Sequence, residues 1–300
     1  MIKGLHIELT NKCTLKCPRC SRTQFIEQFP KKWTNTDINF KDLLEFIDID
    51  ITGLTMKLCG NYGDPIYYDE LIELIRELKK RKANIELSTN GSYKSQEWWH
   101  QLAGVLTDSD RVIFGIDGVP ENFTKYRVNA DWSSMLTGIT EMILSEAQVV
   151  WQYILFSYNL DTVEQARQLA EKLGFDHFET AESVRWDNKD DWLMPKSNSV
   201  SDKKVMWKGN KDLEIDALCK NNQKEHYISA DGYYSPCCFI AEHNFYYKTD
   251  FYKKRDRYAI KNNTLSKILT SADTVSFYNS IEQEQPSVCT FNCPKVEHGI

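Results

Sequence analysis

Short apolar segments alternate with amphipathic ones six times up to about residue 184, and this alternation limits the possible folds more than any other feature. The amphipathic segments repeat apolar residues at i, i+3, i+4 and i+7, which is typical of helices packed on one face. Such alternation predicts an α/β fold of parallel strands joined by right-handed crossovers. We expect strands at 4–10, 54–59, 84–89, 111–117, 148–156 and 176–184, and helices at 68–82, at 95–106 from Ser95, at 133–146 from Ser133, and at 161–173 between Asp161 and Gly174.

Three cysteines follow the first expected strand. Cys13, Cys17 and Cys20 have the spacing Cys-x3-Cys-x2-Cys, and they suit three irons of a [4Fe–4S] cluster, which usually has four cysteine ligands. A site that is one ligand short leaves one iron open to a small molecule, which favours an enzyme. Zinc is the alternative, but structural zinc sites have four ligands and His6 is the only nearby fourth candidate.

Composition excludes several classes of function. The chain has 300 residues with 41% hydrophobic and 12% aromatic content, enough for one large domain or two modest ones. A net charge of −6 argues against nucleic acid or an anionic membrane as the main partner. There is no apolar run near the ~20 residues of a membrane span and no signal-peptide core at the N-terminus. We therefore expect a cytoplasmic protein without membrane contact.

The chain divides into three parts by pattern. Residues 1–186 carry the strand and helix alternation, and residues 187–216 are polar and read as a linker or a substrate-side loop. Residues 217–300 contain short strand-like pieces, a turn at Asp231-Gly232 and five of the nine cysteines. Clustered cysteines in a reducing compartment indicate metal more often than disulfides. Since this last part has little apolar content, we expect a metal to stabilise it.

The three-cysteine loop resembles that of the radical S-adenosylmethionine (SAM) superfamily, and three later loops match it in order. Residues 60–65 look like the family's Gly-Gly-Glu-Pro loop, residues 88–91 resemble its Thr-Asn-Gly signature, and residues 114–118 resemble its Ser-Ile-Asp-Gly element. The resemblance implies a partial (β/α)6 TIM-like barrel that binds SAM on the open iron. The SAM contacts that it implies are Gly60, Asn61, Tyr62, Gly63, Asp64, Ser88, Asn90, Asp117 and Arg127.

Two positions depart from the family pattern. Asp64 stands where the family usually has Glu, and Arg19 stands where an aromatic residue usually helps to seat adenine. Two implied contacts also have simpler interpretations. Asp117 could be a turn-forming residue before glycine, and Arg127 a surface ion-pair partner.

The C-terminal part resembles the SPASM/Twitch auxiliary-cluster domain, a small cysteine-rich α+β unit. The resemblance implies a second [4Fe–4S] cluster on Cys219, Cys237, Cys289 and Cys293, and the shorter Twitch form fits better because no cysteine lies between Cys238 and Cys289. Zinc is a rival here, since four thiolates suit either metal. Cys238 is left over, as a packed thiol or as a catalytic hydrogen-atom or proton donor.

The resemblance implies reductive cleavage of SAM to a 5′-deoxyadenosyl radical, which abstracts hydrogen from a substrate. The auxiliary cluster would then help to oxidise or crosslink a small molecule or a peptide or protein side chain, and flavodoxin or ferredoxin would supply electrons. The alternatives are an iron–sulfur electron-transfer or metal-binding protein without SAM chemistry, and a degenerate barrel that acts as a scaffold.

Several other features have plain structural interpretations. We expect Cys59 and the pair Trp98-Trp99 to be packing residues, the histidines to be structural, and the basic run at 253–257 to be a solvated face. Residues 22–37 carry Phe25 and Trp33 and are expected to form a lid or a substrate contact.

Overall fold

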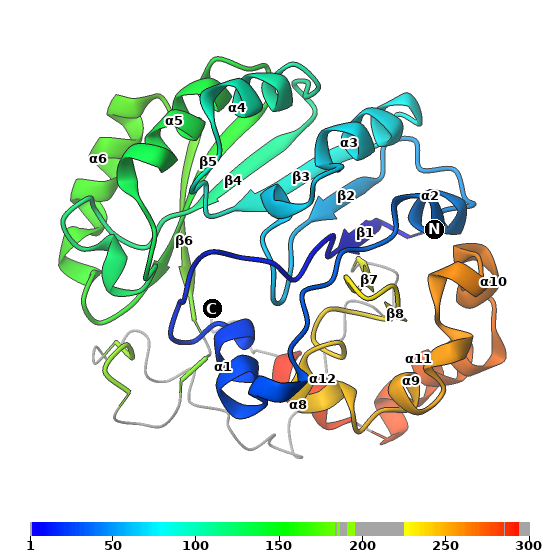
Figure 1. Cartoon of the computed structure of the whole chain (residues 1–300). Coiled ribbons are helices and arrows are strands. Elements are labelled where there is room, and N and C mark those ends of the chain that lie inside the picture. The colour runs from blue at the N-terminus through cyan, green and yellow to red at the C-terminus, as the bar shows by residue number, and fades with distance from the viewer. Residues whose placement is uncertain (1, 184, 187–190, 196–224, 285, 294–300) are drawn as a thin grey trace, which may run out of the picture.

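The structure is a computed structural model that describes residues 2–183, 185–186, 191–195, 225–284 and 286–293. Its centre is one eight-stranded sheet in the order β6-β5-β4-β3-β2-β1-β7-β8 (Figure 1). The six strands from β1 to β6 run parallel, as the alternation predicted, and the sheet stays open rather than closing on itself. The strands are β1 (Gly4–Ile7), β2 (Thr55–Leu58), β3 (Asn84–Thr89), β4 (Arg111–Gly115), β5 (Gln148–Leu155), β6 (His177–Glu182), β7 (His226–Ile228) and β8 (Tyr234–Ser235).

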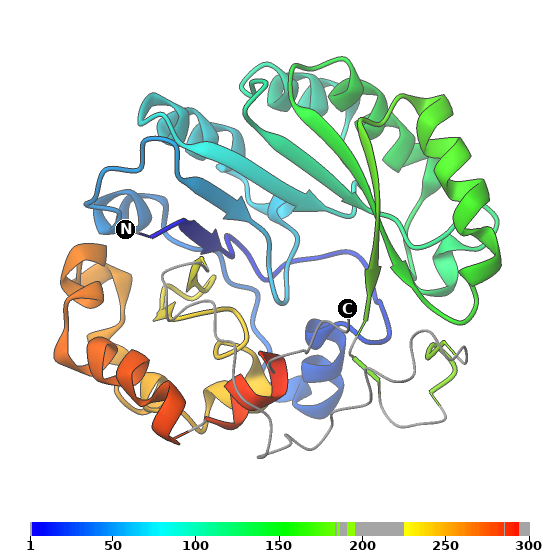
Figure 2. The same ribbon diagram turned by 180° about the vertical axis from the view of Figure 1, so that it is seen from behind.

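Helices cover the outer face of the parallel sheet, and its inner face is turned toward α1 and the C-terminal part (Figures 1 and 2). Helix α3 packs on the sheet through one apolar side. Its buried residues are Leu71, Leu74, Ile75 and Leu78, which have the i, i+3, i+4, i+7 spacing of the sequence pattern. The helices of this part are α1 (Ser21–Gln28), α2 (Phe40–Phe46), α3 (Leu71–Lys80), α4 (Gln96–Ala103), α5 (Trp132–Ile143) and α6 (Val163–Leu173).

The helix ends confirm two sequence predictions and correct two. Ser95 caps α4 by accepting a hydrogen bond from the Trp98 amide, and Gly174 ends α6 in the left-handed conformation with φ of 96°. Helix α5 begins at Trp132, one residue before the expected start at Ser133, and Asp131 is its cap, accepting from Ser134 N. Asp161 is not the cap of α6, since it lies in a 3-10 turn before that helix begins.

The inner face of the sheet carries a row of charges. Lys57 on β2 pairs with Glu86 on β3 at 3.1 Å, Arg111 on β4 lies 3.4 Å from Glu86, and Arg111 also pairs with Glu179 on β6 at 2.7 Å. These ion pairs link strands that are neighbours or near neighbours.

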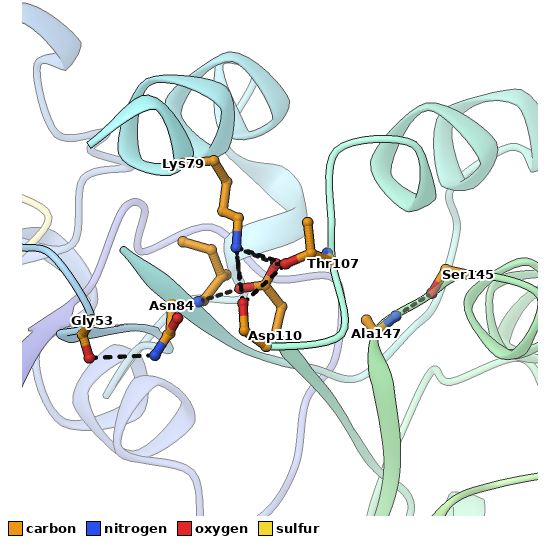
Figure 3. A network of polar contacts seen from close by, with 9 residues as sticks. Gly53, Lys79, Asn84, Thr107, Asp110, Ser145 and Ala147 are labelled. Atoms are coloured by element: carbon orange, nitrogen blue, oxygen red, sulfur yellow. Dashed lines mark hydrogen bonds and ion pairs between the residues drawn. The ribbon is translucent and has the colours of Figure 1, made fainter. Parts of the chain in front are cut away.

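A second polar network secures the amino end of β4 (Figure 3). The fully buried Asp110 accepts hydrogen bonds from Ile85 N at 2.7 Å, Thr107 N at 2.8 Å and Lys79 Nζ at 2.8 Å. The same lysine also donates to Thr107 Oγ1. One carboxylate therefore joins α3, β3 and the turn into β4.

The C-terminal part continues the barrel sheet. Strand β7 pairs parallel with β1, and β8 pairs antiparallel with β7, so the first strand of the chain lies between β2 and β7. Apolar residues of both parts, Leu5 and Tyr234 among them, belong to one hydrophobic core. Strand-like pieces were expected here, but the described residues also form the helices α8 (His243–Tyr246), α9 (Asp250–Lys253), α10 (Leu265–Leu269), α11 (Ala272–Glu284) and α12 (Ser287–Asn292). Among the described residues, no helix combines the length and the apolar character needed to cross a membrane.

Candidate functional site

The three-cysteine loop connects β1 to α1 at the carboxyl end of the sheet. Cys20 is the N-cap residue of α1, and its amide donates to Cys17 O at 3.1 Å, which makes a tight turn. The amide of Lys16 donates to Val128 O at 3.0 Å and fixes the loop against the segment after β4. Cys13, Cys17 and Cys20 all pack against the same small apolar cluster. The fold thus brings the three thiols to one place.

The environment of these thiols suits a bound cation. Burial raises the pKa of Cys13 and of Cys17 to about 12, and the Arg127 guanidinium acts in the opposite direction on Cys17. A thiolate is poorly solvated in such a place, and a metal cation would supply the missing charge. Within the part of the chain that the structure describes, no three His, Cys, Asp or Glu side chains are set at metal-binding geometry. The fit of a cluster therefore rests on the donor chemistry and the loop position.

The glycine-rich loop follows β2 and is held by a buried carboxylate that the sequence analysis missed. Glu8, on the segment after β1, accepts hydrogen bonds from Tyr62 N at 2.6 Å and Gly63 N at 3.1 Å. Its other oxygen accepts from the Tyr227 hydroxyl of β7. Burial raises the pKa of Glu8 to about 7. A glutamate in an otherwise apolar strand was the only sequence signal for this role.

Both glycines of this loop are sterically required. A Cβ atom on Gly63 would lie 1.8 Å from Thr10 O, and one on Gly60 would lie 2.5 Å from Glu8 Oε1. The loop therefore runs directly against the β1 segment, at a distance that only glycine permits. Asn61 points the other way and donates from Nδ2 to Cys238 O at 2.9 Å, which joins the loop to the C-terminal part.

Asp64 organises the end of the loop. It accepts from Thr89 Oγ1 at 2.9 Å and from Asn90 N at 2.6 Å, and it caps the 3-10 turn Pro65–Tyr67 through Ile66 N. Burial raises the pKa of Asp64. The Asn90 side chain lies between Asp64 and the cysteine loop, with Nδ2 at 3.6 Å from Cys13 Sγ. Asp64, although shorter than the usual Glu, therefore links the glycine-rich loop to the loop after β3, and through Asn90 to the cysteine loop.

Ser88 and Cys59 occupy the ends of β3 and β2. The Ser88 side chain hydrogen-bonds the Cys59 thiol, and burial raises the pKa of that thiol to about 11. Cys59 is partly buried and is not part of the apolar core, which differs from the expectation of a packing residue. Trp99 is fully buried in the core, as expected for packing. His6 is also buried, with Nε2 at 2.8 Å from Cys59 O.

Asp117 and Arg127 form a buried ion pair beside the cysteine loop. Arg127 Nε donates to Asp117 Oδ2 at 2.6 Å, and Ile154 N donates to Asp117 Oδ1 at 2.8 Å. Burial raises the pKa of Asp117 and the arginine opposes that shift. A Cβ atom on Gly115 would lie 2.6 Å from Arg127 Nη2, so this glycine gives the guanidinium its path across β4. Both of Asp117's oxygens are thus engaged within the protein.

Arg19 connects the cysteine loop to residues 191–195, the described part of the segment 187–216. Its Nε lies 2.7 Å from Oδ2 of the buried Asp191. The apolar surface beside the loop comes from Tyr126, Phe156 and Trp186, which pack with Cys17. Aromatic side chains therefore adjoin the loop although position 19 is not aromatic.

The described cysteines of the C-terminal part lie just after β8 and on or at the end of α12. Cys237 follows β8 and is 7% exposed, and Cys289 on α12 is 6% exposed. Cys293 ends α12, and its amide donates to Cys289 O at 2.8 Å. A spacing of four residues puts Cys289 and Cys293 on one side of the helix. Cys219 lies outside the described residues.

The open parallel sheet with functional loops at its carboxyl edge is a partial α/β barrel, and sequence models identify the family. The model of the radical SAM superfamily matches residues 7–170, and that of the SPASM domain, an iron–sulfur cluster-binding domain, matches residues 219–294. The chain belongs to the radical SAM superfamily. Its cofactors are therefore SAM, a [4Fe–4S] cluster and auxiliary iron–sulfur clusters.

Curated relatives match part of the chain. A tungsten-containing aldehyde ferredoxin oxidoreductase cofactor-modifying protein of Pyrococcus furiosus is 28% identical over 40% of this chain and 32% of its own length. A PqqA peptide cyclase of Granulibacter bethesdensis is 23% identical over 59% of this chain and 46% of its own length. A probable GTP 3′,8-cyclase of Methanococcus maripaludis is 30% identical over 47% of this chain and 46% of its own length. The chain thus spans less than half the length of each of these relatives.

Solved structures share the fold. Streptococcus suis SuiB bound to precursor peptide SuiA has a TM-score of 0.64 at 12% identity, covering 97% of this chain and 71% of its own. The enzyme anSMEcpe with bound AdoMet has a TM-score of 0.62 at 14% identity, and the match covers 92% of this chain and 80% of its own. BtrN in complex with AdoMet and 2-DOIA has a TM-score of 0.53 at 13% identity, and the match covers 99% of this chain and 94% of its own. At these identities the likeness shows the partial barrel alone, and it bears out the predicted fold class.

Proposed function

We propose that this radical SAM enzyme cleaves SAM reductively, abstracts hydrogen from a substrate, and oxidises or crosslinks that substrate with help from an auxiliary cluster. Bound SAM supplies the 5′-deoxyadenosyl radical when its cluster is reduced. An oxidation would need acceptors for one hydrogen atom, one electron and one proton; the SAM site would supply the first, the auxiliary cluster the second and a base the third. The chain's own residues hold these groups in place and exclude water.

Cys13, Cys17 and Cys20 are the proposed ligands of the first cluster. The observation that carries the proposal is the convergence on this loop of two later strand ends. Asn90 reaches Cys13 Sγ at 3.6 Å, and the charge of Arg127 acts on Cys17. Loops separated by about a hundred residues in sequence meet here, as a shared cofactor site requires.

The proposed SAM contacts follow from what each loop offers. The backbone of Gly60, Asn61, Tyr62 and Gly63 would face the amino group, because the glycines allow close approach. Asp64 positions Asn90, and Asp117 positions Arg127 so that the guanidinium is available to the carboxylate. Ser88 lies at the same edge of the sheet.

Cys219, Cys237, Cys289 and Cys293 are the proposed ligands of one auxiliary cluster. The buried positions of Cys237 and Cys289 and the helical spacing of Cys289 and Cys293 support this set. Cys238 adjoins it, and its backbone carbonyl is bound by Asn61 of the glycine-rich loop. We assign Cys238 as a candidate hydrogen-atom or proton donor, because it joins the auxiliary part to the SAM-binding edge.

The proposed substrate is a small molecule or a peptide side chain held between the barrel mouth and the C-terminal part. SuiB is described with a precursor peptide and anSMEcpe with the Cp18Cys peptide, which favours peptides, whereas the probable GTP cyclases favour a small molecule. Radical SAM enzymes need a reductant, and we propose flavodoxin or ferredoxin for this one.

The decisive experiment measures 5′-deoxyadenosine after dithionite and SAM are added to the anaerobic holoenzyme. We expect product from the wild type and none from Cys13→Ser. The matched control is Cys59→Ser, another strand-end cysteine outside the loop, which should keep both cluster and product. Intact clusters without any 5′-deoxyadenosine would instead indicate an electron-transfer protein.

Iron content tests the auxiliary cluster separately. Two [4Fe–4S] clusters require about eight irons per chain, and Cys237→Ser should lower that number to about four while leaving the SAM-dependent spectrum of the first cluster. A wild type that holds only about four irons, all lost in Cys13→Ser, would remove the auxiliary cluster from the scheme.

A further inference from the structure

A cavity of about 200 Å³ lies behind the glycine-rich loop, between the barrel and the C-terminal part. Four segments contribute lining residues: Glu8 and Asn11 after β1, residues within 25–36 after the cysteine loop, Tyr62 of the glycine-rich loop, and residues within 229–247. None of its described lining residues is a cysteine, so the cavity is distinct from the two proposed cluster sites. It adjoins the SAM-binding edge through Glu8 and Tyr62.

One wall of the cavity is aromatic. Phe25 lies 5.4 Å from the His243 ring, 5.8 Å from Trp33 and 6.3 Å from Tyr62, measured between ring centroids. Tyr62 also contacts Trp33 at 6.1 Å and His243 at 6.2 Å. The His243 backbone amide donates to the Tyr62 hydroxyl at 2.9 Å, so the rings are fixed in position. Aromatic faces are electronegative and attract cations.

Two polar groups at this wall are buried without partners among the described residues. Both ring nitrogens of His243, a residue that is 6% exposed, and the Tyr246 hydroxyl have no hydrogen bond there. His243 Nδ1 lies 2.6 Å from Glu242 Oε1. In the neutral tautomer that carries its proton on Nδ1, beside that carboxylate, Nε2 is a hydrogen-bond acceptor. A buried acceptor without a donor is costly, so this site is built to receive an N–H or O–H group.

The charges of the cavity point the same way. Asp231 lines it, as does Glu8, whose raised pKa of about 7 leaves it partly protonated at neutral pH, whereas Lys32 is the one lysine or arginine among its described lining residues. The Lys32 ammonium is directed at the Phe29 ring, 5.1 Å from its centroid. Carboxylates, a nitrogen acceptor and aromatic faces together disfavour an anion and favour a compact cation.

We propose that this cavity binds a primary ammonium group on an apolar stem and thereby anchors the substrate. The ammonium would donate to His243 Nε2 and Tyr246, and the stem would lie against Phe25 and Trp33. This inference rests on the proposed function, because it takes the anchored molecule to be the one presented to the SAM-binding edge. Two sources share the chemistry: a free alkylamine metabolite and a lysine side chain of a peptide.

Calorimetry on the anaerobic, unreduced holoenzyme with SAM tests the proposal without turnover. The probes are Nα-acetyl-lysine methylamide and Nα-acetyl-norleucine methylamide, which differ at the ammonium group. We expect the lysine probe to bind about tenfold or more tightly than the norleucine probe. Equal affinity, stronger binding of norleucine, or no binding of either probe would overturn the proposal, whatever the variants do.

Variants locate the binding. His243→Phe keeps an aromatic ring but removes Nε2 together with Nδ1 and its contact with Glu242, and Tyr246→Phe removes only the hydroxyl. Each variant should lower the affinity for the lysine probe about fivefold or more and leave the affinity for the norleucine probe nearly unchanged. The matched control is Tyr252→Phe, because Tyr252 packs against Tyr246 but does not line the cavity. Undiminished lysine affinity in folded His243→Phe and Tyr246→Phe would contradict the assigned site.

A third probe, n-hexylamine, separates the two sources. Affinity similar to that of the lysine probe supports a small amine, and much weaker affinity supports a peptide lysine. The proposed function is read independently from 5′-deoxyadenosine formed by the wild type. If the proposed function is wrong, the wild type forms no 5′-deoxyadenosine. If only the ammonium site is wrong, 5′-deoxyadenosine still forms but the lysine probe has no advantage in binding.

Discussion

At the scale of single residues, Glu8 has the widest influence on the site. Its carboxylate holds the glycine-rich loop through two amides and holds β7 through Tyr227, so a residue next to the first strand fixes parts of the chain far away in sequence. Burial disfavours its charge, whereas these hydrogen bonds favour it, and burial prevails. A group in such a balance makes stability depend on pH.

We predict that Glu8 lowers stability as the pH rises toward neutrality. The pKa of Glu8 is raised from 4.5 to about 7 in the folded protein, so between these values the folded state keeps a proton that the unfolded state releases. Its contribution is therefore fully favourable below pH 4.5 and is lost as the pH rises through about 7, by at most about 1.4 kcal/mol per pH unit. Tyr227 and Asp231 are the other titratable groups that act on Glu8.

Glu8→Gln tests this linkage, because an amide cannot titrate. The difference in melting temperature between wild type and variant, followed by circular dichroism from about pH 5 to about 7.5, should shift against the wild type as the pH rises. A difference that stays constant over that range would show that Glu8 does not change its protonation there.

Gly63 makes a steric prediction. A Cβ atom would lie 1.8 Å from Thr10 O, so Gly63→Ala must displace the loop from the β1 segment. We expect SAM affinity to fall about tenfold or more, with iron content unchanged. Gly104→Ala is the control, because its nearest atoms are 3.7 Å away and SAM binding should stay normal. Wild-type SAM affinity in Gly63→Ala would exclude a role for this close approach.

At the scale of helices and strands, the elements with strong local patterns were predictable and the short ones were not. The repeat of α3 and the apolar runs of the six parallel strands are visible in the sequence, so their type and order were predicted correctly. Helix α1 buries only Ser21 and Phe25, and α8 and α9 have four residues each, too few to show a period. The start of α5 was expected at Ser133 and lies at Trp132, because the side chain of Asp131 caps the helix.

Asp110 gives a prediction at this scale. It joins α3, β3 and the turn before β4 through Lys79, Ile85 and Thr107 (Figure 3). Asp110→Asn removes the charge that pairs with Lys79 and puts an amide donor against one of the two backbone donors, Ile85 N or Thr107 N. We expect a loss of about 2–4 kcal/mol in unfolding free energy.

The measurement for Asp110→Asn is urea unfolding under anaerobic conditions, with SAM affinity determined beside it. Asp50→Asn is a matched control, because Asp50 is exposed and should matter little. Since Asp110 lies at the amino end of the barrel, SAM affinity of the folded variant should stay unchanged. Unaltered stability would refute the role of this network.

At the scale of the whole molecule, the contacts that join the two parts could not be read from the sequence. Tyr227 and Glu8 are 219 residues apart, and Asn61 and Cys238 are 177 apart, so no local pattern connects them. The positions of the cysteine, glycine-rich and Asn-Gly loops could be predicted, because parallel strands bring their carboxyl ends to one edge. The aromatic cavity behind Tyr62 could not, because it needs side chains from four separate segments.

We predict that residues 1–186 do not form a stable monomer alone. Without β7, the strand β1 becomes a sheet edge, Glu8 loses Tyr227, and part of the shared core is exposed. Gel filtration of this fragment beside the full chain should show aggregates for the fragment. A monodisperse fragment with a cooperative melting transition would contradict this prediction.

The pairing of β1 with β7 has a consequence for biosynthesis. The ribosome makes the first strand early, but that strand's second neighbour is made only when most of the polypeptide has been translated. Until then the nascent chain carries an unsatisfied backbone edge beside Cys13, Cys17 and Cys20, the proposed cluster ligands. Chaperones and the iron–sulfur assembly machinery would therefore meet the same stretch of newly made protein at the same time.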